Sequence, residues 1–538
     1  MSRRWLAVLI FAVALLLRLF GLGWGLPNSQ RVESLHPDEP IVLMVSKQVN
    51  PLGGDFEPGF YNYGTLYLSL SRLISTGGEF APGTDAYRDD LMRGRLINVV
   101  AGSGIALLVF LILAKRTSKV GAVIGGLAVA FAPGLVVHSR FMTVDVFATF
   151  LVVLALYLAD RIGEENTKPM LMVSLAGLAS GLAGGTKYNF IIVLLAVFVA
   201  IGVSGLANRL RLGLAAFGAC IAGFLIGTPG VLLNPSQFRK DLMYEINHVA
   251  EGHGLVFAGR PIGFISHLGN LLEAFGGLSL IISVAACGFI AWRMRRDETL
   301  RWMLPGLVFA AVYYLLIGRA QVAFLRYVFP IIPVLALGLG WLVAECERVR
   351  SAQARLLIGF AMFSIGGFGG GGLAASVKFS AWMAGEDVRD QAGAWLKERT
   401  KGETVGLVSD PWFYSPTLYP EIQASRPLFM RGGEQWMLGA KDPAVTRGTT
   451  AWAERYDWDP SVIETKPKYI VFSSFEQYDL GRLEQQKVDG FQLQQDRYQA
   501  FAKQLEQGYK LVQTFGFGGT TTHDMMYVRP VLFVYERK

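Results

Sequence analysis

The sequence predicts a mostly helical, polytopic membrane protein with a soluble α/β domain at its C-terminal end. Of its 538 residues, 52% are hydrophobic and only 17% are charged, a balance typical of membrane proteins and a poor fit to a soluble enzyme. The 62 glycines agree with this class, because small residues let membrane helices approach closely. From about residue 378 the long apolar runs give way to short ones, and this change predicts the soluble domain.

The predicted membrane part begins with an apolar run that extends to about Leu22. This run contains Arg18 and has no cleavage site made of small residues, so we interpret it as a retained helix and not as a secretory signal. Further runs of roughly 17 to 25 residues are long enough to cross a bilayer and bring the expected total to about eleven crossings. They lie near residues 96–114, 120–137, 146–160, 170–186, 189–207, 212–233, 270–291, 302–318, 326–344 and 356–376.

Basic residues gather in every second connection between these runs. The excess of 50 Lys plus Arg over 42 Asp plus Glu lies in such clusters, so it indicates membrane topology and not a nucleic-acid-binding face. The positive-inside rule then predicts a cytoplasmic N-terminus and an extracytoplasmic C-terminal domain. We expect the chain to lie in the cell (inner) membrane. The basic clusters lie at residues 3–4, 115–119, 161–168, 209–211, 293–301 and 348–355.

This topology divides the chain into a membrane domain at 1–377, with outer loops at 23–95 and 234–269, and a soluble domain at 378–538. The first outer loop contains a helix-like stretch at 64–74, which we expect to lie along the membrane surface. In the tail, short apolar runs alternate with amphipathic helical stretches, a pattern that favours a small α/β fold. A glycine patch at 366–372 lies inside the last predicted crossing and is interpreted as close helix packing or a kink.

Three carboxylates are predicted at the outer face. Asp38 and Glu39 follow the first crossing, and Asp145 stands in the short outer loop before the fourth. Such groups can accept the proton of an attacking hydroxyl or hold a cation. The alternative is that they begin helices, where an acidic residue caps the first turn or favours the helix dipole.

Cationic residues are predicted at the same face. Arg95 begins the second crossing, Lys187 lies in a tight turn, and Arg326 opens the tenth crossing. Arg can bind a phosphate through two hydrogen bonds, and Lys binds it as a point charge. The alternative is that each side chain only extends from a helix end toward water. His248 and His253 lie in the second outer loop, where they could bind a metal or sugar hydroxyls, although ordinary polar loop histidines fit the spacing better.

Taken in order, these motifs resemble glycosyltransferase family 39, which includes the protein O-mannosyltransferases and the lipid A aminoarabinose transferases. The likeness covers roughly residues 1–376, and the order of the motifs is its specific part. His248 and Gly252-His253 also resemble a bacterial branch of that family. The motifs are His36-Pro37-Asp38-Glu39, the stretch 60–67, Arg95, Ser139-Arg140 with Asp145, Lys187-Tyr188, and Arg326-Tyr327 with Pro330 and Pro333.

The resemblance implies a GT-C fold and transfer of a sugar from a polyprenyl-phosphate donor to a hydroxyl of a lipid, glycan or protein acceptor, with inversion. It implies that Asp38 is the general base and that Glu39 and Asp145 orient it or hold a cation. No cofactor is required, although a divalent metal could bind Asp38, Glu39 and Asp145. Donor phosphate contacts are expected from Arg95, Lys187 and Arg326, and substrate contacts from His36, Tyr61, Tyr63, Tyr188, His248, His253 and Tyr327.

Two other classes of function stay open at the level of sequence. A transporter or flippase for a lipid-linked or sugar substrate could use interfacial charges for ion coupling, although we find no inverted repeat between the halves of the chain. A membrane receptor or scaffold would place the whole function in the soluble tail. Substitution of Asp38 separates an enzyme from a scaffold.

Overall fold

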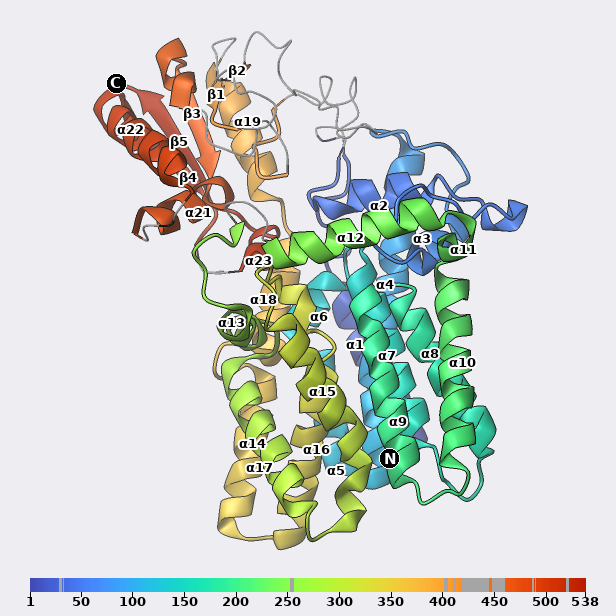
Figure 1. Ribbon diagram of the computed structural model, residues 1–538. Coiled ribbons are helices and arrows are strands. Elements are labelled where there is room, and N and C mark those ends of the chain that lie inside the picture. Colours follow the sequence, from blue (N-terminus) through green and yellow to red (C-terminus); the bar gives the residue numbers. More distant parts are fainter. Residues whose placement is uncertain are drawn as a thin grey trace.

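Long apolar helices run roughly side by side in a bundle, and the C-terminal segment stands above one end of it (Figure 1). The computed structural model of the chain describes residues 1–28, 31, 33–251, 256–400, 405–409, 413–418, 445–447, 460–485, 488, 490–518 and 522–538. The bundle and its upper end contain α1 (Arg3–Leu19), α4 (Asp85–Arg116), α5 (Lys119–Ala130), α6 (Pro133–His138), α7 (Val144–Asp160), α8 (Pro169–Gly184), η2 (Tyr188–Val193), α9 (Leu194–Val203), α10 (Arg209–Gly227), α14 (Gly277–Arg293), η4 (Glu298–Met303), α15 (Leu304–Ile317), η5 (Leu325–Val328), α16 (Ile332–Val349), α17 (Ala352–Gly366) and α18 (Gly372–Ala384).

Small residues set the packing between α8 and α10, which touch along much of their lengths. A Cβ atom added to Gly177 would lie 2.1 Å from the carbonyl oxygen of Ala216, and one added to Gly181 would lie 2.0 Å from that of Cys220. The two backbones therefore approach at a distance that glycine alone permits. This close approach is the role that the glycine content of the sequence predicts.

The eleven predicted crossings are not confirmed. Within the described residues, three helices are long and apolar enough to cross a membrane, namely Asp85–Arg116, Arg209–Gly227 and Glu298–Ile317, and a bent pair, Gly263–Phe275 with Gly277–Arg293, would make a fourth. Several predicted runs are broken instead. The run at 120–137 is split at Pro133, because proline lacks the N–H that would continue α5.

The glycine patch also breaks its predicted crossing. The run at 356–376 is divided between α17 and α18, and Gly367, Gly369, Gly370 and Gly372 between them have positive φ angles. Gly371 lies against Gly276, the bend between α13 (Gly263–Phe275) and α14, where an added Cβ on Gly371 would come within 2.3 Å of the Gly276 Cα atom. The patch thus serves both as a helix break and as a close contact.

The N-terminus and several basic clusters meet at the end of the bundle away from the C-terminal domain (Figure 1). Lys119 donates a hydrogen bond to the Met1 carbonyl at 3.4 Å, and Lys115 pairs with Asp160 at 3.3 Å. Basic residues that cluster along the sequence therefore also lie together at one end of the folded bundle.

Helices outside the bundle lie toward its opposite end. They are α2 (Asp38–Ser46), η1 (Pro51–Gly53), α3 (Leu66–Leu73), α11 (Gly230–Leu233), α12 (Pro235–Glu251) and α13. The predicted helix at 64–74 is present as α3. Most of the segment predicted as the outer loop 234–269 is helical, and α12 lies across the ends of the bundle helices (Figure 1).

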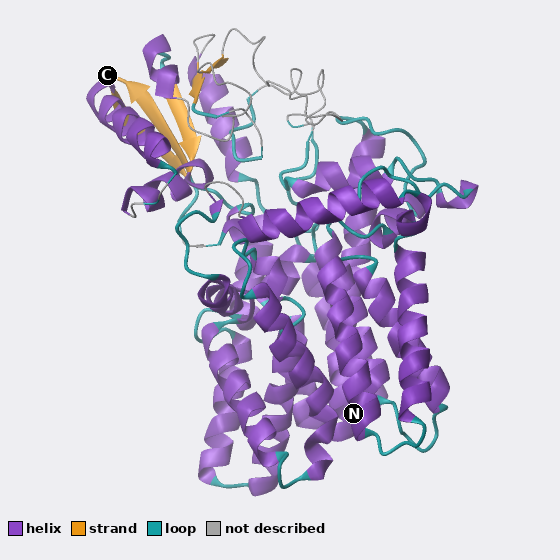
Figure 2. Ribbon diagram, in the orientation of Figure 1, coloured by secondary structure: helices purple, strands orange, loops and turns teal. Residues whose placement is uncertain are grey.

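The C-terminal domain is built on a mixed sheet with the strand order β2-β1-β3-β5-β4 (Figure 2). β1 is parallel to both β2 and β3, whereas β5 is antiparallel to both β3 and β4. The boundary expected at residue 377 falls within α18, and α19 follows as the first helix of the sheet domain. Its elements are α19 (Val388–Thr400), β1 (Val405–Leu407), β2 (Val445–Arg447), η7 (Pro460–Thr465), β3 (Tyr469–Ser473), α21 (Ser474–Gln485), α22 (Gln492–Gly508), β4 (Tyr509–Phe515), α23 (His523–Met526) and β5 (Leu532–Arg537).

Candidate active site

Asp38 and Glu39 form the first turn of α2, but their side chains have different surroundings. Pro37 occupies the N-cap position and makes no side-chain cap, so both carboxylates lie where they favour the helix dipole. The Asp38 side chain is 27% exposed, whereas that of Glu39 is fully buried. Adjacent helical residues point in directions about 100° apart, so one carboxylate faces the interior and the other faces the outer surface.

Glu39 is paired with Arg95 inside the protein. Arg95 Nε and Nη2 donate to the two Glu39 oxygens, each at 2.7 Å, while Arg95 Nη1 donates to the carbonyls of Leu22 and Trp24. Burial opposes the ionisation of Glu39, but Arg95 and its hydrogen bonds hold the pKa of Glu39 below its ordinary value. The Arg95 guanidinium is already bound by a carboxylate. This arrangement favours a structural role for Arg95 over the phosphate contact expected from the sequence.

Asp145 and Lys187 form an ion pair at the same end of the bundle. Asp145 begins α7 and is almost fully buried, and Lys187 precedes η2 and is 15% exposed. The Lys187 ammonium also lies 4.4 Å from the centre of the Tyr327 ring, a distance at which the ring stabilises a cation. Lys187 is therefore oriented by Asp145 and Tyr327 together.

Arg326 joins Asp38 and Asp145 into one cluster. Its Nη2 lies 3.4 Å from an Asp38 oxygen, and its Nε lies 3.8 Å from an Asp145 oxygen. A third carboxylate comes from the C-terminal domain, because Arg326 Nη1 donates to Asp524 at 2.7 Å. Sequence reasoning did not find Asp524, which lies in no recognisable motif and is separated from Arg326 by 198 positions.

The two tyrosines predicted in the first outer loop have different surroundings. Tyr61 is fully buried and its hydroxyl donates to Glu57 at 2.7 Å, whereas Tyr63 lies near Asp38 and Arg326. Tyr188 donates from its hydroxyl to the carbonyls of Tyr61 and Tyr63, at 2.7 and 2.9 Å, and so fixes the loop above α8. The Tyr61 backbone N–H donates to Asp241 of α12. Burial and the nearby Asp38 carboxylate raise the pKa of Tyr63 well above its ordinary value. Tyr63 is thus neutral and could donate a hydrogen bond to a substrate.

The three predicted substrate-binding histidines differ in position. His36 is buried between the rings of Phe141 and Tyr527, at 4.3 and 5.2 Å, and its Nδ1 accepts a hydrogen bond from the Asp38 backbone. His248 is half-buried on α12, and its ring stacks with Tyr244 at 5.8 Å. His253 lies outside the described residues. His36 is placed to support Asp38 and is almost closed to a ligand.

The carboxylates predicted to hold a metal do not converge. Glu39 is engaged by Arg95, while Asp38 and Asp145 both face Arg326. In the described part of the chain there is no group of three or more His, Cys, Asp or Glu side chains that could hold a metal ion. Asp38 and Asp145 therefore lie around Arg326, and Glu39 does not join them as the sequence predicts.

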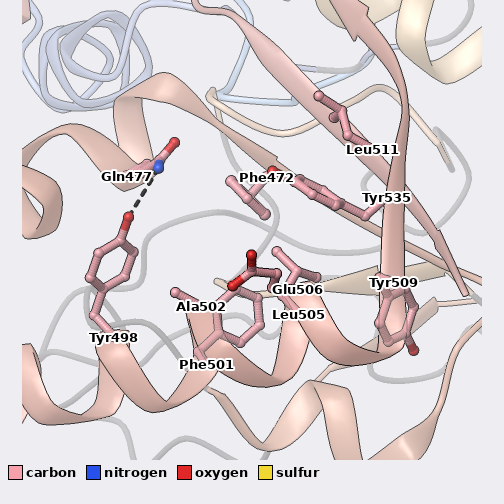
Figure 3. Close-up of a pocket in the computed structure, with 10 residues that line it drawn as sticks. All are labelled: Phe472, Gln477, Tyr498, Phe501, Ala502, Leu505, Glu506, Tyr509, Leu511 and Tyr535. Atoms are coloured by element: carbon pink, nitrogen blue, oxygen red, sulfur yellow. Dashed lines mark hydrogen bonds between the residues drawn. The ribbon is translucent and has the colours of Figure 1, made fainter.

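A separate pocket of about 300 Å³ lies in the C-terminal domain between α22 and the sheet (Figure 3). Five of its ten lining residues are aromatic, Phe472 and Phe501 among them, and the Gln477 amide donates a hydrogen bond to the Tyr498 hydroxyl at 2.9 Å. None of its lining residues belongs to the predicted site. Phe472, Phe501 and Tyr498 are part of the buried core of this domain, so the pocket is a gap in domain packing.

Part of the chain matches a known protein family. Residues 81–217 match the family model described as dolichyl-phosphate-mannose-protein mannosyltransferase. No curated protein matches the chain by sequence. The matched stretch contains Arg95, Asp145 and Lys187, but it leaves Asp38, Arg326 and the C-terminal domain outside.

Solved structures match over nearly the whole chain. ArnT from Cupriavidus metallidurans, bound to undecaprenyl phosphate, has a TM-score of 0.52 at 14% identity and covers 99% of this chain and 98% of its own. The Archaeoglobus fulgidus oligosaccharyltransferase tethered with an acceptor peptide has a TM-score of 0.51 at 16% identity and covers 96% of this chain and 74% of its own. At these identities the likeness shows a shared fold. The family match and the shared fold together relate this chain to the GT-C glycosyltransferases, the group of the O-mannosyltransferases and ArnT.

Proposed function

We propose that the chain transfers a sugar from a polyprenyl-phosphate donor to an acceptor hydroxyl at the extracytoplasmic face of the membrane. The observation that carries this proposal is the convergence of Asp38, Asp145, Lys187 and Arg326 at one end of the bundle. These residues come from four separate segments of the chain and supply one accessible carboxylate beside two cations. ArnT, which shares the fold, was solved with undecaprenyl phosphate bound.

In the proposed reaction, Asp38 accepts the proton of the acceptor hydroxyl. Asp38 is better suited to this role than Asp145, because its side chain is 27% exposed and that of Asp145 only 4%. The acceptor oxygen forms a bond to C1 of the sugar from the side opposite the phosphate, so the configuration at C1 inverts. The bond between C1 and the phosphate oxygen breaks, and its electron pair stays on the phosphate.

Lys187 and Arg326 stabilise the charge that develops on the leaving phosphate. Cations held in place before the reaction are effective because no energy is spent on orienting them during it. Asp145 orients Lys187, and the acceptor hydroxyl belongs to a lipid, a glycan or a protein. Tyr63, from the first outer loop, contributes to the wall against which the sugar binds.

The test is an assay of the purified full chain in lipid with a panel of radiolabelled polyprenyl-phosphate sugars, scored for transfer or for hydrolysis. Asp38→Asn keeps the shape of the side chain but cannot accept a proton, and loss of a general base lowers turnover by about 100-fold to 10,000-fold. Donor binding should stay within a few-fold. Asp89→Asn, at an exposed position of α4, is the matched control.

Two results would count against the proposal. The first is that no donor in the panel gives product or hydrolysis with the wild-type chain. The second is that Asp38→Asn keeps most of the turnover at saturating donor, since another group would then have to accept the proton.

A further inference from the structure

The C-terminal domain contributes a side chain directly to the charge cluster of the membrane domain. Asp524, in the short helix α23, is fully buried and contacts both the side chain and the backbone of Arg326. One carboxylate oxygen accepts from Arg326 Nη1 at 2.7 Å, and the other accepts from the Arg326 backbone N–H at 3.1 Å. The Asp524 carboxylate therefore holds both the backbone and the side chain of Arg326.

This contact decides which edge of the guanidinium faces the proposed substrate. Asp524 occupies Nη1, while Nε and Nη2 face Asp145 and Asp38 at the longer distances of 3.8 and 3.4 Å. The edge formed by Nε and Nη2 is one of the two-pronged donor edges with which arginine binds phosphate. The Arg326 side chain also stacks 4.1 Å from the centre of the Phe324 ring, which limits its rotation.

We propose that Asp524 is a positioning residue that aims Arg326 at the donor phosphate, so that docking of the C-terminal domain completes the phosphate site. This inference rests on the function proposed above. Asp524 touches no reacting atom and acts through Arg326. Its carboxylate also balances the charge of Arg326.

The segment that carries Asp524 is held in place from both sides. The neighbouring His523 pairs through Nε2 with Asp479 at 2.6 Å, and Asp479 also pairs with Arg260, from the segment before α13, at 3.3 Å. On the other side, the Tyr527 carbonyl accepts a hydrogen bond from Arg389 at 2.9 Å. The contact between Asp479 and Arg260 spans the junction between the two domains, and the other two contacts tie α23 to the rest of the C-terminal domain, so the position of Asp524 depends on how the domains dock.

The role of Asp524 can be tested by measuring the affinity of the full chain for undecaprenyl phosphate in nanodiscs. Asp524→Asn keeps the volume but removes the charge, and we expect the affinity to fall at least about 10-fold, the lower end of the range for a hydrogen bond to a charged group. Asp524→Glu keeps the charge with a longer side chain and should fall between the wild type and Asp524→Asn. It also supplies the measurement if the Asn variant does not fold.

The control is another carboxylate at the domain junction. Asp390 pairs with Arg31 at 2.6 Å but does not contact Arg326, so Asp390→Asn weakens docking without touching the phosphate site. We expect its affinity for undecaprenyl phosphate to stay within about two-fold of the wild type. An equal loss in Asp390→Asn and Asp524→Asn would overturn the specific role of Asp524.

A double-mutant cycle shows whether Asp524 acts through Arg326. In the Arg326→Ala background, Asp524→Asn should change the affinity by less than about two-fold, because the group that it positions is gone. Additive losses would overturn the proposal. If the wild-type chain does not bind undecaprenyl phosphate, the proposed function fails as well, whereas wild-type binding that Asp524→Asn leaves intact overturns only the role of Asp524.

Discussion

At the scale of single residues, neighbouring carboxylates in α2 take opposite roles. Glu39 is fully buried and bound by Arg95, whereas Asp38 is partly exposed beside Arg326. A buried ion pair is costly to break, because the remaining charge stays inside without a partner. Glu39 and Arg95 therefore fix the first outer loop to α4, and this fixed frame holds Asp38 at the surface.

Lys187→Ala should weaken the binding of undecaprenyl phosphate by about 10-fold to 150-fold, which corresponds to the roughly 1.5–3 kcal/mol of a hydrogen bond to a charged group. Lys47→Ala is the matched control, since Lys47 also pairs with a buried aspartate, Asp90, but lies outside the proposed site. Binding can be followed in nanodiscs, with thermal unfolding as a check on folding. Equal affinity in the wild type and in Lys187→Ala would remove Lys187 from the phosphate site.

His36 should make the stability of the protein depend on pH. Burial lowers the pKa of His36 from 6.5 to about 3, so between these values the unfolded chain binds a proton that the folded chain does not. Stability is therefore greatest above pH 6.5 and falls as the pH drops toward 3, by up to about 1.4 kcal/mol for each pH unit.

The measurement is thermal unfolding in detergent between pH 6.5 and pH 5. Burial raises the pKa of Glu33 and of Glu476 to about 7, so the effect of His36 is taken from a comparison with a variant that lacks its imidazole. His36→Phe replaces the ring with one that fits between Phe141 and Tyr527 but cannot bind a proton. Its unfolding temperature should change less with pH than that of the wild type. Parallel pH profiles for the two proteins would show that His36 is not the group responsible.

At the scale of elements, glycines decide where helices end. The sequence predicts one crossing at 356–376, but α17 ends at Gly366 and α18 starts at Gly372. The contact of Gly371 with the Gly276 bend explains why this break is needed. It brings α18 back against α6 and α1, next to the segment that leads into the C-terminal domain.

Gly371→Ala should lower the free energy of unfolding by about 1–3 kcal/mol, the usual cost of adding a methyl group where there is no room for it. The added Cβ would lie 2.3 Å from the Gly276 Cα atom, so the backbone would have to move. Gly366→Ala is the matched control, because no atom lies within 4 Å of its added Cβ. Thermal unfolding of the two variants in detergent should separate them, and equal stability would mean that the contact is not tight.

At the scale of the whole molecule, charge and domain placement agree. The N-terminus and the clusters around Lys115 and Lys119 lie at one end of the bundle, and the C-terminal domain lies at the other (Figure 1). The positive-inside rule assigns the basic end to the cytoplasm. From this rule we expect the proposed site at the extracytoplasmic end, beneath the C-terminal domain.

A topology reporter fused after Lys538 should be active outside the cytoplasm. The matched control is the same reporter inserted at Glu165, in the turn between α7 and α8 at the basic end, which should be active inside. The opposite pattern would reverse the orientation of the molecule. Activity of both fusions on the same side would contradict the placement of these segments at opposite ends of the bundle.

Sequence alone determined the helical class, the α/β character of the tail and the basic end of the bundle. These features depend on local composition and on the spacing of apolar and charged residues, which can be read along the chain. It also singled out Asp38, Asp145, Lys187 and Arg326, which the fold brings together, because residues beside the ends of apolar runs on one side of a membrane share one surface.

Tertiary structure decided which of these charges pair with one another. Asp38 and Glu39 are adjacent carboxylates that the sequence alone does not distinguish. Only the packing of α2 on α4 places Glu39 against Arg95 and leaves Asp38 partly exposed. The helix break at the glycine patch likewise involves a neighbouring backbone, that of Gly276, so the length of the apolar run did not reveal it. Asp524 reaches Arg326 across 198 positions because two domains dock, and a contact made by docking has no signature in the local pattern of either segment.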